Sequence, residues 1–191
     1  MSLNISLYTI TACLLLDNEG RRLFAKYYQT QNPSHAYKNA AQQNQFELSV
    51  FSKINKMHQD ILLYDNHLIA YKQTNDVVLV VVSSVAENEA MVYSLANNLH
   101  EALTILLNSS LDKATVVEKY DMVSLCVDEA IDDGIILEMD PAIIVSRVTN
   151  PPSASAVAGE LLSKIEFSER GLMNAFAFAS KKLSERIQQG I

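Results

Sequence analysis

The chain has 191 residues, of which 49% are hydrophobic, and its 15 Lys and Arg residues against 22 Asp and Glu residues leave a formal charge of −7. This length and composition suffice for one buried core with an appendage. No Lys- or Arg-rich block rises above the acidic background, and binding phosphates needs a concentrated positive patch. Composition therefore disfavours direct binding to nucleic acid.

The cysteines and the apolar runs indicate the redox setting of the protein and whether it spans a membrane. Cys13 and Cys126 lie far apart in apolar stretches and form no C-x-x-C or Cys/His pattern, so we interpret both as small buried hydrophobic residues in a reducing, cytosolic setting. Purely apolar runs such as residues 77–82 have the length of a strand, whereas a membrane-spanning helix needs about 20 residues. We expect no membrane span.

The first elements form a predicted β-hairpin. Residues 5–16 are almost continuously apolar, turn-forming residues occupy 17–20, and residues 21–28 resume a strand pattern. Apolar side chains fall on both faces of the first strand, so we expect it to be central in a sheet that is covered on both sides. An amphipathic helix is predicted over residues 34–58. The apolar residues at helical spacing in it are Phe46, Val50, Ile54 and Met57.

Three short strands are predicted next, over residues 61–64, 67–73 and 77–83, because turn-forming pairs separate them. Ser84 and Glu87 then have the spacing of a capping box, which predicts the start of a long helix. The apolar stripe of this helix consists of Met91, Leu95, Leu99, Ala102, Leu103 and Leu106.

The end of the domain contains two further predicted helices. One covers residues 116–131 and ends near Gly134, which suits a helix stop; residues 135–137 are then extended, and Asp140-Pro141 opens the last helix. The order ββαβββαα predicts an α/β (α+β) domain with a five-stranded, antiparallel-rich sheet and helices on both faces.

A composition break at Asn150-Pro151-Pro152-Ser153 divides the chain into a domain of residues 1–149 and a segment of residues 150–191, hereafter the tail. The tail combines a linker with apolar residues at near-helical intervals, which predicts an amphipathic helix. These residues are Leu161, Leu162, Ile165, Leu172, Met173, Phe176, Leu183 and Ile187. Three alternatives stay open for this helix: it packs on its own domain, it binds a partner protein, or it contacts a membrane.

The sequence contains no recognised catalytic, cofactor or metal-binding motif. Its five glycines are isolated and build neither a phosphate loop nor a dinucleotide fingerprint. We expect His58 and His67, which flank a predicted strand, on the surface rather than as ligands. The acidic residues 128–140 do not fit a calcium loop, because Ala130 and Asp133 occupy the positions of a ligand and of the turn glycine. We expect a solvated acidic helix end, no catalytic residue, no cofactor, no metal and no enzyme activity.

Several strings resemble one known family in their order and spacing. LYTI at residues 7–10, LLDNEG at 15–20 and FAKYY at 24–28 resemble its opening hairpin, and VDEAIDDG at 127–134 resembles its later helices. Over residues 5–149 the chain thus resembles the small-subunit family of adaptor complexes. This family has a longin-like domain and comprises the zeta chains of coatomer and the sigma chains of clathrin adaptors, of which the zeta branch is the nearer match.

The resemblance implies a non-enzymatic role in the COPI vesicle coat, which serves Golgi-to-ER and intra-Golgi transport. It implies a direct heterodimer with the large coatomer gamma subunit, association with the other coatomer subunits, and indirect recruitment by an Arf-type GTPase to the cytosolic side of the Golgi membrane. Two alternatives are a sigma-type clathrin-adaptor chain that helps to recognise sorting signals, and a longin-fold regulator of a small GTPase. Arg21, Arg22 and residues 110–115 match the sorting-signal pocket of sigma chains poorly, so we do not transfer that pocket.

A coat subunit should expose apolar surface that its partner covers. The candidate interface residues are Tyr64, Ile69 and Tyr71 in the middle strands and Leu172, Phe176 and Leu183 in the tail. For each of them the alternative is packing within the core of the chain itself.

Overall fold

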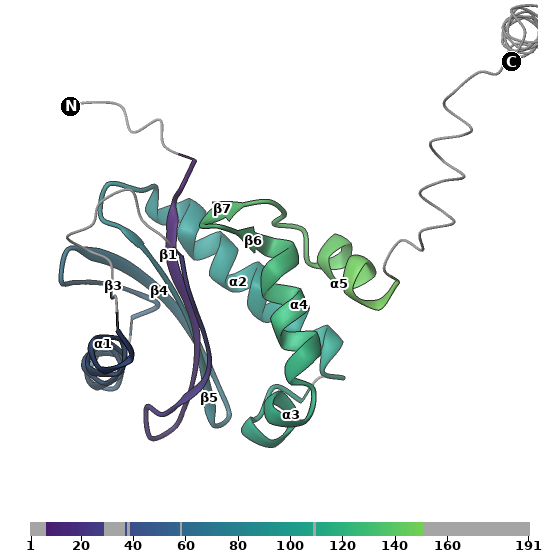
Figure 1. Ribbon diagram of the computed structural model, residues 1–191, viewed down its shortest axis with the longest axis horizontal. Coiled ribbons are helices and arrows are strands. Elements are labelled where there is room, and N and C mark those ends of the chain that lie inside the picture. The colour runs from purple at the N-terminus through teal and green to yellow at the C-terminus, as the bar shows by residue number, and fades with distance from the viewer. Residues whose placement is uncertain (1–6, 29–36, 38, 58, 109, 151–191) are drawn as a thin grey trace, which may run out of the picture. The chain divides into compact units, whose positions relative to one another are not determined.

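The structure is a computed structural model that describes residues 7–28, 37, 39–57, 59–108 and 110–150 (Figure 1). The chain divides into two units, residues 1–151 and 152–191, and the described residues lie in the first. The predicted helix of the tail falls outside the described residues. It remains a prediction, as does the division at residue 150.

The observed elements follow the predicted order. They are β1 (Ile10–Asp17), β2 (Arg22–Tyr27), α1 (Ala40–Ile54), β3 (Ile61–Tyr64), β4 (His67–Thr74), β5 (Val77–Ser84), α2 (Glu89–Leu106), α3 (Lys113–Glu118), α4 (Tyr120–Ala130), β6 (Ile131–Asp132), β7 (Ile135–Ile136) and α5 (Pro141–Thr149).

The main sheet has five strands in the order β2-β1-β5-β4-β3, and every neighbouring pair is antiparallel. This confirms the predicted α/β class and the central place of the first strand. The reason lies in the side chains of β1: Cys13 and Leu15 enter one core, whereas Leu14 and Leu16 enter the other. A strand with apolar residues on both faces is stable only where both faces are covered.

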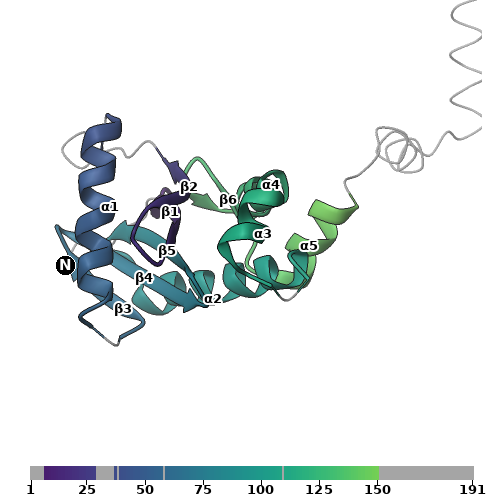
Figure 2. The same ribbon diagram turned by 90° about the horizontal axis from the view of Figure 1, so that it is seen from below.

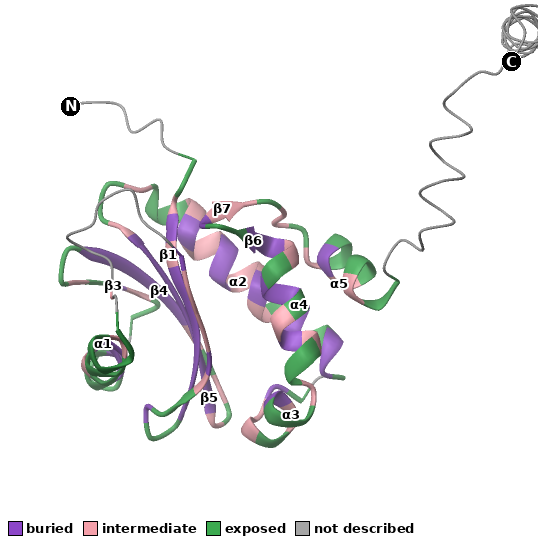
Figure 3. Cartoon of the chain, viewed as in Figure 1, coloured by how far each residue is buried: buried purple, intermediate pink, exposed green. Residues whose placement is uncertain are grey.

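Helices cover both faces of the sheet, as predicted. The helix α1 packs on one face, where Phe46, Val50 and Ile54 enter the second core, and α2 packs on the other (Figure 2). The helices α4 and α5 pack against α2, which is consequently buried along much of its length (Figure 3). Leu99 in the predicted stripe of α2 is fully buried, so the register of that helix is confirmed.

The start of α2 differs from the prediction. Asn88, rather than Ser84, is the N-cap, and its side-chain oxygen accepts hydrogen bonds from the N–H groups of Ala90 and Met91 at 3.0 and 3.3 Å. Ser84 is unavailable for this role because β5 continues to it, where it pairs with His67. Local spacing suggested a capping box, but the ladder of the sheet extends over its first residue.

The region predicted as one helix over 116–131 is two helices and a strand. A break at Lys119 separates α3, capped by Asp112, from α4. Ile131 begins a two-stranded ladder of β6 and β7, of which the sequence predicted only the extended stretch that contains β7. Gly134 is therefore not a helix stop but part of the turn of this ladder, with φ of +82°. A Cβ atom there would lie 2.5 Å from the carbonyl oxygen of Ile10, so the turn needs glycine.

Candidate partner interface

Two of the three candidate residues in the middle strands are core residues. Ile69 is fully buried and Tyr71 is 6% exposed, both in the core beneath α1. The hydroxyl of Tyr71 also donates a hydrogen bond to the carbonyl oxygen of Met57 at 2.7 Å. The expectation that they expose apolar surface is wrong, because β4 is an inner strand covered by α1 on this face.

Tyr64, the third candidate, lies on the edge strand β3 and is half-buried. Its ring stacks on Phe46 with 6.3 Å between centroids, and the ammonium of Lys53 lies 4.7 Å above it. The exposed apolar residue of this strand is its neighbour Leu63, at 65% exposure, which the sequence did not single out. Leu63 pairs with Leu68 on β4 and has no further strand beyond it among the described residues.

The three candidate residues of the tail, Leu172, Phe176 and Leu183, lie outside the described residues. Their role in an interface stays a prediction.

Exposed apolar side chains also lie elsewhere in the described part of the chain, and several of them are neighbours in the fold. Val117, Tyr120 and Leu125 lie on α3 and α4. Leu7 and Leu137 lie beside the small ladder, where Tyr8 forms a bridge with Ile135. Exposed apolar groups of this kind mark potential contact surfaces when they gather.

The basic residue at the start of β2 is engaged inside the domain. Arg22 donates through Nε and Nη2 to the two carboxylate oxygens of Glu47 on α1, at 3.0 and 2.6 Å, and the hydroxyl of Tyr27 donates to Glu47 Oε1 at 2.8 Å. Glu47 is fully buried. Burial and this hydrogen bond raise the pKa of Tyr27, so its hydroxyl stays a donor. The group fastens the first hairpin to α1.

The segment after α2 is likewise tied into the fold. The ammonium of Lys113 lies 2.8 Å from Oδ2 of Asp17, a fully buried carboxylate that also accepts from the N–H groups of Glu19 and Arg21. Burial alone would raise the pKa of Asp17, but the hydrogen bonds from Lys113 and the backbone outweigh it and hold this pKa below its usual range. Lys113 and Arg22 thus serve structural contacts within the domain.

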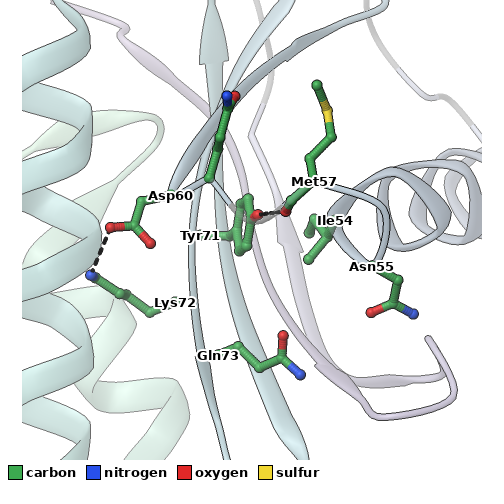
Figure 4. A pocket seen from close by; sticks show the side chains of 8 residues that line it. Ile54, Asn55, Met57, Asp60, Tyr71, Lys72 and Gln73 are labelled. Carbon is green, nitrogen blue, oxygen red and sulfur yellow. Dashed lines mark hydrogen bonds and ion pairs between the residues drawn. The ribbon is translucent and has the colours of Figure 1, made fainter.

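A cavity of about 410 Å³ opens where β3 begins (Figure 4). Its lining residues are Ile54, Asn55, Met57, Gln59, Asp60, Tyr71, Lys72 and Gln73. Lys72 lies 3.3 Å from Asp60 Oδ2, and the hydroxyl of Tyr93 on α2 donates to the same oxygen at 2.9 Å. The hydrogen bond from Tyr93 makes the largest contribution to lowering the pKa of Asp60, and the bond from Lys72 adds to it. Together they outweigh partial burial, which would raise this pKa, so Asp60 and Lys72 form an ion pair at neutral pH.

Of the histidines and cysteines that the sequence offers as possible ligands or reactive groups, His67 and both cysteines are buried in the fold. His67 is buried against the rings of Tyr37 and Phe46, so its expected surface position is wrong, and His58 lies outside the described residues. Cys13 and Cys126 are free and buried, as predicted, and burial raises both pKa values to about 12.

The acidic residues 128–140 surround helix ends, as expected, and several have basic partners. Asp128 pairs with Lys26, and Arg147 pairs with Glu129 and Glu138 at 3.7 and 3.3 Å. Within the described ranges, no group of three or more His, Cys, Asp and Glu side chains could hold a metal ion, and no helix is long and apolar enough to cross a membrane.

Comparison with known proteins shows which family the chain belongs to. Residues 9–154 match the family described as clathrin adaptor complex small chain. A structure titled as a homology model of the full-length AP-3 complex in a stretched open conformation shares the fold, with a TM-score of 0.58 at 16% identity over 82% of this chain and 99% of that chain. The sheet and its two helical layers are thus those of an adaptor small chain.

The more similar relatives are coatomer subunits. The chain is 38% identical to coatomer subunit zeta of Saccharomyces cerevisiae over 98% of this chain and 99% of the yeast protein. It is 38% identical to human coatomer subunit zeta-1 over 75% of this chain and 78% of the human one, and 34% identical to zeta-2 of Arabidopsis thaliana over 91% and 92%. The chain belongs to the adaptor small-chain family, in its coatomer zeta branch.

Proposed function

We propose that the chain is a non-enzymatic subunit of the COPI vesicle coat that pairs directly with the large gamma subunit of coatomer. The identity of 38% with yeast coatomer subunit zeta, over nearly the whole of both chains, carries this proposal. In the coat the chain associates with the other coatomer subunits on the cytosolic side of the Golgi membrane. An Arf-type GTPase recruits the complex to this membrane, and the chain is linked to the GTPase only indirectly, through the complex.

The exposed side of β3 is the part of the described structure that we assign to the gamma subunit. Leu63 is the most exposed apolar residue of the described strands, and its neighbour Tyr64 is half-buried. Permanent interfaces bury apolar residues at their centre, and an exposed edge strand invites association. The apolar stripe of the tail, with Leu172, Phe176 and Leu183, is the second proposed contact.

Co-expression of the full chain with the gamma subunit tests this assignment. Leu63→Asp should reduce co-purification, because a charge would enter the centre of the contact. Val117→Asp on α3 is the matched control at an apolar residue of similar exposure, 59% against 65%. Circular dichroism should show both variants folded. Unchanged pairing of Leu63→Asp, or a loss with Val117→Asp alone, would exclude the β3 surface.

The purified complex from this co-expression also distinguishes a coat subunit from the two alternatives, a sigma-type adaptor chain and a regulator of a small GTPase. Preferential pairing with a clathrin-adaptor large chain would indicate a sigma-type subunit, and acceleration of nucleotide exchange on a small GTPase would indicate a regulator. We expect neither result.

A further inference from the structure

We draw no further inference here: the strongest candidate, the end of β4 beyond its pairing with β3 together with the cavity that opens beside it, is an open sheet edge whose lysine and carboxylate pair with each other, and nothing in the described part of the chain shows what covers it.

Discussion

Replacing Arg22 should show how much its ion pair with Glu47 contributes to the stability of the domain. Arg22→Met leaves the fully buried carboxylate with the hydroxyl of Tyr27 but without its cation. Loss of one partner from a buried ion pair costs about 3–5 kcal/mol. The side chain of Arg22 is 36% exposed, so solvent screens part of the pair, and we expect a loss of about 2–3 kcal/mol in the free energy of unfolding.

Urea denaturation followed by far-UV circular dichroism measures this loss, since the chain has no tryptophan. Arg21→Met is the matched control: Arg21 pairs with Glu19 at the exposed turn, and its loss should change stability by less than about 0.5 kcal/mol. Adding Glu47→Leu to Arg22→Met should restore much of the stability, because an apolar pair replaces a buried charge. Equal stability of Arg22→Met and the native chain, or a double variant as weak as the sum of its parts, would refute the reasoning.

Three further outcomes are expected. Leu99→Asp places a charge in the fully buried stripe of α2 and should cost on the order of 4 kcal/mol in thermal or urea unfolding, whereas an unchanged melting temperature would contradict the packing. Gly134→Ala should cost more than about 1 kcal/mol, because φ is positive and the added Cβ meets the backbone; full stability would mean that the turn can relax. The pKa of Asp17 is lower folded than unfolded, so its contribution is present above about pH 4 and is lost as the pH falls through the folded value. Lys113→Met should reduce this acid-side loss in urea midpoints measured against pH, and an unaltered pH profile would contradict the role of the pair.

Strands and turns were the most predictable part of the fold. The ranges of β3, β4 and β5 agree with the sequence within a residue, because the turns between them carry Asp and Asn at positions with positive φ, such as Asn66 and Asn75. Local turn chemistry determines such boundaries. The strand β7 lies in the stretch 135–137 that the sequence predicts to be extended, but β6 and its pairing with β7 are not predictable, because a two-residue strand has no periodicity to detect.

The exposed apolar residues of the sheet were harder to predict, because their exposure depends on which strand lies at the edge. An apolar run marks a buried strand but gives no order across the sheet, so the sequence alone leaves both the core and an interface open for Ile69 and Tyr71 and does not single out Leu63. The apolar pair Leu62 and Leu63 also hides the alternation that separates inner from outer side chains. The pair of Arg22 with Glu47 joins distant elements, and no local pattern signals such a contact.

Affinity purification of the tagged full chain from cytosol, with mass spectrometry of the bound proteins, tests the central claim most directly. The account predicts the coatomer gamma subunit at one-to-one stoichiometry, together with the other coatomer subunits. Recovery of a clathrin-adaptor large chain in its place, or of the chain without any large coat subunit, would contradict it.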